Sequence, residues 1–219
     1  MGFTPERVIF QIILPGLLQT FQMLALGFVF SVVVGFALGL VLYTTSERGL
    51  RPTPVLYRAL DAVINVLRSV PFLILMITVM PLSRLIFHTV IGTGPAVFSI
   101  TIACAPLLAR LFEASFREVD PSLIEAAQSF GASRLAITRE VIVGESVPAL
   151  VSNITLGTIS ILGCSAMAGV VGAGGIGAIA LTYGYQNFND QIMYGTVLIL
   201  IVLVQLIQYS GDRIYRRVK

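Results

Sequence analysis

Residues 120–133 read DPSLIEAAQSFGAS, a charged stretch with helical patterning that lies between long hydrophobic runs. Asp120 can cap the unpaired amides at the start of a helix, and Pro121 suits the first helical position because its missing N–H would have no partner there. A competing register uses Ser122 as the cap, with Glu125 three residues later completing a capping box. In either register the stretch predicts a short helix between hydrophobic segments.

A turn and a second helix are predicted directly after it. Gly131 can end the first helix in the left-handed conformation, and Ser133 can start another. Leu135, Thr138 and Ile142 would then lie along one face of the second helix. We therefore expect two short helices at an angle to each other at a membrane surface, which is a shape suited to docking on another protein.

These residues also carry a family resemblance. Residues 125–127 read Glu-Ala-Ala, Gly131 follows after three residues, and an apolar segment containing Pro148 comes later; this pattern resembles the EAA loop of ABC importer permeases. In that family the loop forms coupling helices that sit in a cleft of a cytoplasmic ATPase. One departure is Gly144, which stands where the family usually has a proline. The alternative is an ordinary amphipathic surface helix with a glycine cap, which the position between hydrophobic spans disfavours.

The resemblance implies the type I ABC importer permease fold, an all-α membrane protein. It makes residues 1–219 a single transmembrane permease domain, in which residues 112–146 form the cytoplasmic coupling segment. ATP hydrolysis then belongs to a separate ATPase subunit, so the chain itself is not an enzyme. The residues to which the resemblance assigns coupling with the ATPase are Glu125, Ala126, Ala127, Gly131 and Ala132.

Composition alone identifies a membrane protein. Hydrophobic residues make up 56% of the chain, charged residues only 11%, and the mean hydropathy is +0.92, whereas a soluble domain carries about a quarter charged residues. Cys104 and Cys164 both lie in apolar runs, so we expect small buried side chains and no disulfide framework. The single histidine and the lack of paired Cys/His spacing predict no metal site, and no cofactor is expected.

Uncharged runs predict five membrane spans, since a spanning helix needs about 20 mostly apolar residues. The first runs from about Thr20 to Tyr43, the third from Thr89 to Ala109, and the fifth from Ile192 to Gly211. The second must include Arg68 near one end, with its side chain reaching the interface or facing the bundle interior. The fourth lies in the long uncharged gap that ends at Asp190.

Basic residues predict how these spans are oriented. Eleven Arg and Lys residues follow spans one, three and five, against two on the other side, with Arg68 uncounted. This imbalance predicts an N-terminus outside and a C-terminus in the cytoplasm of a bacterial inner membrane, in a multi-pass protein without a cleavable signal peptide. The larger group comprises Arg48, Arg51, Arg58, Arg110, Arg117, Arg134, Arg139, Arg213, Arg216, Arg217 and Lys219, and the smaller comprises Arg7 and Arg84.

Two further motifs lie within the hydrophobic part. Residues 68–72 read Arg-Ser-Val-Pro-Phe and resemble a stretch of amino-acid importer permeases; Arg68 could pair with Asp61 or with a backbone carbonyl. Residues 172–177 match a dinucleotide-binding glycine pattern, but no predicted strand precedes them and no acidic residue follows at the required distance. The glycines would instead allow close backbone packing, or an irregular segment at a gate. Gly35 and Gly39 in the first span predict close helix approach.

Several segments together resemble the permease subunit of methionine ABC importers. They are residues 164–167, the glycine run, residues 183–185 and residues 209–213. The substrate, methionine as its D or L form or both, follows from this resemblance only. For the solute pathway we select Ser165, Met167 and Gly169, because small residues permit a lumen and Met167 offers a soft, adaptable surface. Packing of Met167 in the core is an equal alternative.

The expected partners follow from the span count and the resemblance. Five helices are too few to enclose a solute path, so a second copy of the chain should complete it. Two copies of a cytoplasmic ATPase, an extracytoplasmic amino-acid-binding protein and membrane lipid are expected, and nucleic acid is not. The alternatives are a permease for another amino acid or small polar solute, a membrane-embedded enzyme, or a secondary carrier. The last two are disfavoured because the predicted spans hold neither paired catalytic groups nor mid-span ionisable residues for proton coupling.

Overall fold

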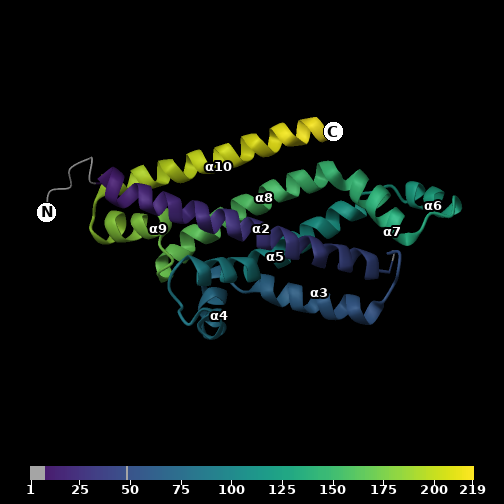
Figure 1. Ribbon diagram of the computed structural model, residues 1–219, viewed down its shortest axis with the longest axis horizontal. Coiled ribbons are helices and arrows are strands. Elements are labelled where there is room, and N and C mark those ends of the chain that lie inside the picture. The colour runs from purple at the N-terminus through teal and green to yellow at the C-terminus, as the bar shows by residue number, and fades with distance from the viewer. Residues whose placement is uncertain (1–7, 48) are drawn as a thin grey trace.

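The computed structural model describes residues 8–47 and 49–219, and within that part of the chain all regular structure is helical (Figure 1). The predicted all-α fold is confirmed. Arg7 and Arg48, two of the basic residues used to predict orientation, lie outside the described residues. The elements are η1 (Val8–Ile13), α2 (Leu14–Thr45), α3 (Pro54–Ser69), α4 (Phe72–Phe87), α5 (Thr93–Arg117), α6 (Pro121–Ser129), α7 (Arg134–Ala136), η2 (Ile137–Val143), α8 (Gly144–Ala168), η3 (Gly169–Val171), α9 (Gly175–Ile179), η4 (Ala180–Gln186) and α10 (Asp190–Val218).

Four helical segments among the described residues are long and apolar enough to cross a membrane by themselves. They are Ile9–Thr45, Thr93–Arg117, Arg134–Val171 and Asp190–Val218. The helices α3 and α4 qualify only as a pair, which is bent by 112°. Counted as one span, the pair brings the total to five, which is the predicted number.

The bend has a local cause. A residue that precedes proline is driven out of the helical region, and Val70 accordingly has φ −89° and ψ 126° in front of Pro71. Arg68 is in the last turn of α3 and therefore sits at the bend, with its side chain exposed. The prediction that Arg68 lies near one end of a continuous spanning helix is wrong, because Pro71 divides the span into two helices.

The centre of the molecule is α5, which packs along α2. A side chain at Gly39 would place its Cβ 2.7 Å from the carbonyl oxygen of Ala109, and one at Gly35 would place it 2.7 Å from the Cβ of Leu108. Both distances are too short for a real Cβ atom. The predicted close approach at these two glycines is therefore confirmed.

Aromatic rings fill the core toward the end of α5. Phe36 of α2 makes edge-to-face contacts with Phe112 and Phe116, whose ring centroids lie 5.9 and 5.7 Å away. Tyr43 continues this stack onto Phe116 at 5.8 Å. Since Phe112 and Phe116 are fully buried, this aromatic cluster fixes the ends of α2 and α5 against each other.

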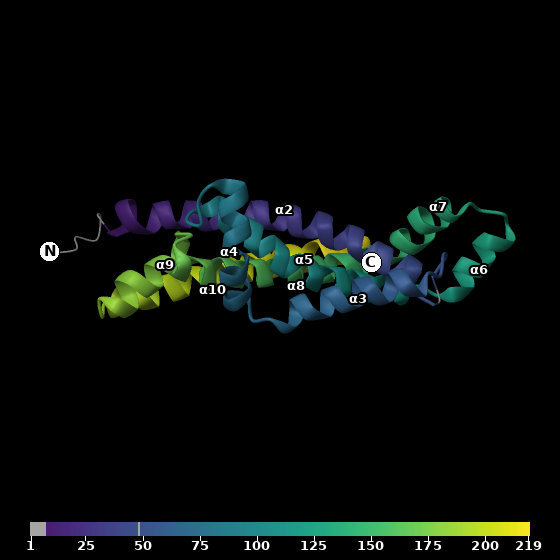
Figure 2. The ribbon, with the colours of Figure 1, turned by 90° about the horizontal axis from the view of Figure 1, so that it is seen from below.

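The long helices run between two different ends of the molecule. The short helices α6 and α7 project at one end, and α9 lies with the start of α2 at the other (Figures 1 and 2). The last helix, α10, runs beside α8, so the C-terminus points toward the end that carries α6 and α7 (Figure 1). Each end is therefore a separate candidate for a functional site.

Candidate functional site

The helix α6 begins as its sequence predicts. The Asp120 carboxylate accepts a hydrogen bond of 2.9 Å from the backbone N–H of Ser122, and Pro121 occupies the first helical position. Asp120 is therefore the cap, and the competing register with Ser122 as the cap is not the one adopted. The hydrogen bonds from the backbone and hydroxyl of Ser122 hold the pKa of Asp120 below its ordinary value. A carboxylate at this position also interacts favourably with the helix dipole.

The predicted turn at Gly131 is also confirmed. Gly131 has φ +76°, which is the left-handed region that favours glycine. Its N–H donates to the carbonyl of Gln128 at 2.9 Å, and the N–H of Ala132 donates to the carbonyl of Ala127 at 3.0 Å. The Ser133 hydroxyl then accepts from the N–H of Ala136 at 3.2 Å and starts α7.

The second helix is not the short one that the sequence pattern suggests. After three residues α7 passes into η2 and then into α8, so a single helical segment runs from Arg134 to Val171 (Figures 1 and 2). Gly144 keeps helical angles, φ −58° and ψ −53°, and Pro148 lies inside α8 without ending it. The expectation of two separate short helices is wrong for the second, which is the start of the fourth span.

The two faces of α6 differ in burial. Ile124 and Ala127 pack against the main core, whereas Glu125 and Ala126 are exposed. Gly131 and Ala132 are exposed as well. All the residues assigned to coupling thus lie on one protruding segment, and only Ala127 among them is partly buried.

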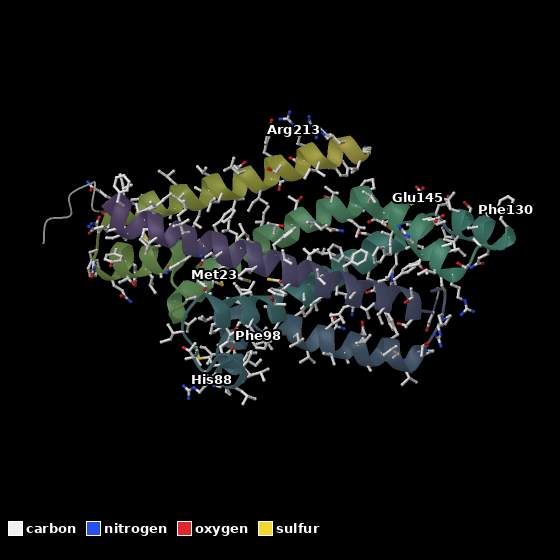
Figure 3. The ribbon with its side chains drawn as sticks, viewed as in Figure 1. Met23, His88, Phe98, Phe130, Glu145 and Arg213 are labelled. Carbon is white, nitrogen blue, oxygen red and sulfur yellow. The ribbon has the colours of Figure 1, made fainter. Side chains whose placement is uncertain are left out.

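Two large apolar side chains at this tip were not among the predicted site residues. Phe130, at the tip in Figure 3, is 91% exposed, and Leu135, on the other side of the Gly131 turn in the sequence, is 77% exposed. In the sequence, the helical spacing of Leu135 with Ile142 suggested one shared face, yet Ile142 is fully buried and Leu135 is not. Exposed aromatic and aliphatic side chains on a rigid turn are typical of a protein–protein contact.

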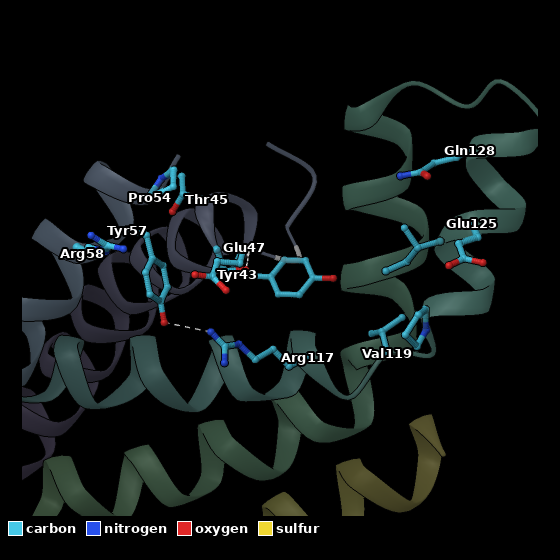
Figure 4. Close-up of a pocket in the computed structure, with 13 residues that line it drawn as sticks. Tyr43, Thr45, Glu47, Pro54, Tyr57, Arg58, Arg117, Val119, Glu125 and Gln128 are labelled. Atoms are coloured by element: carbon cyan, nitrogen blue, oxygen red, sulfur yellow. Dashed lines mark hydrogen bonds between the residues drawn. The ribbon is translucent and has the colours of Figure 1, made fainter. Parts of the chain in front are cut away.

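A cavity of about 720 Å³ separates α6 from the ends of α2, α3 and α5. Tyr43, Tyr57 and Arg117 line it on one side, and Glu125 and Gln128 line it from α6 (Figure 4). Because of this hollow, α6 is held to the rest of the chain mainly at its two ends and through its inner face.

The three residues selected for the solute pathway lie in different environments. Ser165 is 1% exposed and donates its hydroxyl to the Leu162 carbonyl at 2.7 Å. Gly169 is buried against the backbone of α9 at Ala178. Met167 is 53% exposed. Within one copy of the chain, therefore, only Met167 offers its side chain to a surface, and the pathway assignment stays a prediction.

Met167 belongs to an exposed stripe on α8 and η3. Leu156, Gly163 and Val170 are exposed on the same helical segment, and the spacings of seven, four and three residues put them on one face with Met167. No polar or charged motif marks this stripe, so it was missed in the sequence. The spacing of its exposed members along the fourth span is the signal that could have revealed it.

Comparison with known proteins identifies the family. Residues 35–219 match the family model described as binding-protein-dependent transport system inner membrane component. The chain belongs to this family of transport components. The resemblance seen in the EAA stretch is thereby confirmed over most of the sequence.

Individual relatives of this transport component have methionine transporter names. The chain is 44% identical over 200 residues to a probable D-methionine transport system permease protein MetI of Vibrio cholerae, which covers 91% of the chain and 89% of the relative. It is 38% identical over 174 residues to the methionine import system permease protein MetP of Bacillus subtilis, covering 80% and 78%. A solved chain of the inward-facing MetNI methionine ABC transporter matches with a TM-score of 0.95 and 36% identity, covering 99% of this chain and 100% of that one.

The glycine run of this transport component is a packed turn. Gly174 and Gly175 have φ +78° and +85°. The Gln19 side-chain oxygen accepts from the Gly175 N–H at 2.8 Å, and the Thr20 hydroxyl accepts from the Ile176 N–H at 2.8 Å. The run therefore packs its backbone against α2, which is the first of the two roles expected for it.

Two side-chain pairings complete the comparison with the sequence predictions. Cys104 is buried, Cys164 is half-buried and both are free, as expected, with their sulfur atoms 3.7 Å apart. Arg68 does not pair with Asp61, whose carboxylate binds Arg110 instead. Of the two alternatives for Arg68, pairing with Asp61 is wrong, because α5 brings the Arg110 guanidinium to that carboxylate.

Proposed function

We propose that this transport component is the permease subunit of an ATP-driven ABC importer and that its solute is methionine. The observation that carries the proposal is the full-length likeness, in both sequence and fold, to chains named for methionine import. The substrate rests on those names, because the side chains of the stripe around Met167 are apolar and do not distinguish one amino acid from another. Hydrolysis of ATP is assigned to a separate cytoplasmic subunit.

The α6 end of the molecule is the proposed docking site for that ATPase. Glu125, Ala126, Ala127, Gly131 and Ala132 form its backbone scaffold, and the exposed Phe130 and Leu135 supply apolar contact area. The caps at Asp120 and Ser133 and the left-handed turn make the segment a defined shape. A defined shape lets the ATPase push or pull on α5 and α8 without first ordering a loop.

An orientation and an assembly are part of the same proposal. The α6 end shares its side with the C-terminal end of α10, which holds Arg213, Arg216 and Arg217, so we place both in the cytoplasm and the N-terminus outside. A second copy of the chain would cover the exposed stripe of α8 and enclose the solute path. An extracytoplasmic binding protein would deliver the amino acid at the α9 end, in keeping with a family that depends on such proteins.

The solute pathway is proposed to run beside the fourth span near Ser165, Met167 and Gly169. Met167 supports this through its exposed thioether, which can adapt to an apolar side chain. Ser165 would contribute through its small side chain, which leaves room beside the helix. Gly169 would contribute by letting α9 pack close to the fourth span. Cysteine at the exposed Gly163 should react with a membrane-impermeant thiol reagent at a rate that depends on the nucleotide state. Equal protection in every state would move the pathway elsewhere.

Uptake by the reconstituted transporter tests the function. Proteoliposomes holding this chain, its ATPase and the binding protein should accumulate labelled methionine only when ATP is present on the ATPase side. Unlabelled methionine should compete, and alanine should not. Accumulation driven by a proton gradient without ATP would identify a secondary carrier, and accumulation of alanine but not methionine would overturn the proposed substrate.

A further inference from the structure

A cluster of polar and charged side chains joins α3 to α5 beside the cavity that Tyr57 and Arg117 line. At its centre Glu113, with a side chain only 4% exposed, accepts hydrogen bonds from Arg110 at 2.8 Å and from Arg117 at 2.6 Å. All three residues are on the last turns of α5. Because a buried carboxylate is costly unless it is paired, these two guanidinium partners are what allow Glu113 to lie there.

The cluster reaches across to α3 through residues spaced four apart. Asp61 forms an ion pair with Arg110, and Asn65 accepts a hydrogen bond from Arg110 at 3.2 Å. Tyr57 donates its hydroxyl to Glu113 at 3.3 Å and accepts from Arg117 at 3.1 Å. The α3–α5 charge cluster therefore consists of Tyr57, Asp61 and Asn65 on one helix and Arg110, Glu113 and Arg117 on the other.

Stability alone does not account for such a cluster. Buried ion pairs are weak evidence for stabilisation, because apolar residues of similar volume often do as well or better. The directional pairs add a second constraint to the apolar contacts by which Ile64 of α3 packs with Leu42 and Ala109. The cluster thus helps to set where α3 sits along α5.

Its position in the chain places it between α6 and the bent second span. Arg117 ends α5, and Asp120 caps α6 only three residues later, with the intervening Val119 buried at 7% exposure. At its other end α3 bends at Pro71 into α4, whose Phe87 packs on Phe98 of α5 at 6.0 Å. A displacement of α6 that moves the end of α5 therefore acts directly on Arg117 and, through Glu113 and Tyr57, on α3.

We propose that the α3–α5 charge cluster transmits the movement of the coupling segment to α3, so that α3, the half of the second span before the Pro71 bend, moves when the ATPase moves α6. Asp61 and Glu113 are then positioning residues for transport. The inference rests on the proposed function, since it presumes that α6 is moved by an ATPase. It adds a route by which that movement reaches α3, a helix that is not next to α6 in the chain.

The test is the number of solute molecules imported per ATP hydrolysed by the reconstituted complex. Asp61→Asn and Glu113→Gln should each lower this ratio by about threefold or more, while ATP hydrolysis per assembled complex persists. Tyr57→Phe removes one hydroxyl and keeps the ring, so it should lower the ratio less, without endangering the fold. Asp61→Glu keeps the carboxylate and should stay near the wild-type ratio. Asp212→Asn is the matched control, an exposed acid on α10 outside the cluster.

Two results would overturn the cluster's role. One is an unchanged ratio in both Asp61→Asn and Glu113→Gln. The other is a parallel loss of hydrolysis and import that simply follows the amount of assembled complex, which would indicate a structural role only. Failure of the proposed function is detected separately, in the wild-type transporter. If the wild type imports another amino acid, the number of solute molecules imported per ATP is measured with that amino acid, and the variants are compared in the same way.

Discussion

Two glycine turns, one at each end of the molecule, share a backbone conformation and differ in everything around it. Gly131 has φ +76°, and a Cβ built on it would have no atom within 4 Å. Gly175 has φ +85°, and its Cβ would lie 2.8 Å from the Thr20 hydroxyl and 2.9 Å from Met23. The first turn is open and presents side chains outward, whereas the second is packed against α2. A turn at the α6 end is therefore available to a partner, and the turn at the α9 end is part of the fold.

The largest effect is expected from a side chain in the packed turn. Gly175→Val adds left-handed strain and a clash with Thr20 and Met23, which together cost about 3 kcal/mol or more. The variant should accumulate poorly in the membrane and lose both ATPase assembly and transport. Normal accumulation and thermal stability of purified Gly175→Val would show that this turn is not packed as described.

The same substitution in the open turn should separate folding from transport. Gly131→Val adds strain at φ +76° but meets no neighbouring atom, so the chain should insert and accumulate normally while α6 is misplaced relative to α7. Uptake should be lost. If uptake stays normal while the ATPase remains bound, the coupling role of residues 125–131 is wrong.

A smaller effect is expected from removing one exposed ring. Phe130→Ala leaves the fold unchanged because the side chain is 91% exposed, but it should weaken ATPase binding by about 2 kcal/mol, roughly thirtyfold in Kd, if the ring is a central contact. Phe188, 89% exposed between η4 and α10, is a matched control, and Phe188→Ala should leave the affinity for the ATPase unchanged. Equal losses of ATPase affinity in Phe130→Ala and Phe188→Ala would show that the ATPase does not distinguish the α6 end from the other end.

The smallest effect concerns acid. The hydrogen bonds that lower the pKa of Asp120 stabilise α6 fully at pH values above the unfolded pKa, and this stabilisation is lost as the pH falls through the lowered, folded pKa. A spin label at position 128 should thus stay immobile down to pH values below the ordinary range of an aspartate and then gain mobility. In Asp120→Asn the amide oxygen still caps the helix but does not titrate there, so the acid-induced gain should disappear. An identical gain in Asp120→Asn would assign it to another group.

The same comparison shows which features could be predicted from the sequence. The caps at Asp120 and Ser133 and the turn at Gly131 involve residues two to five apart, so local rules were enough to find them. The pairing of Asp61 with Arg110 joins residues 49 apart, and nothing local distinguishes Arg110 from Arg68 as its partner. The burial of Ser165 depends on how α8 packs on α5 and α9, and the exposure of Phe130 depends on how α6 packs on η2. Hydropathy along one helix records neither. The bend at Pro71 was not predicted, because a proline in a spanning helix does not by itself say whether the helix kinks or breaks.

Cross-linking from the two exposed phenylalanine positions to the ATPase is the most direct test of the α6 end as the docking site. Cysteine is placed at position 130 or 188 in a chain whose Cys104 and Cys164 are replaced by alanine, and a bifunctional thiol–amine reagent is applied to the assembled transporter. If the α6 end is the docking site, position 130 is linked to the ATPase and this link stops ATP-driven uptake. Position 188 is not linked to the ATPase. A link from position 188 with none from position 130 would contradict the assignment of the α6 end as the docking site.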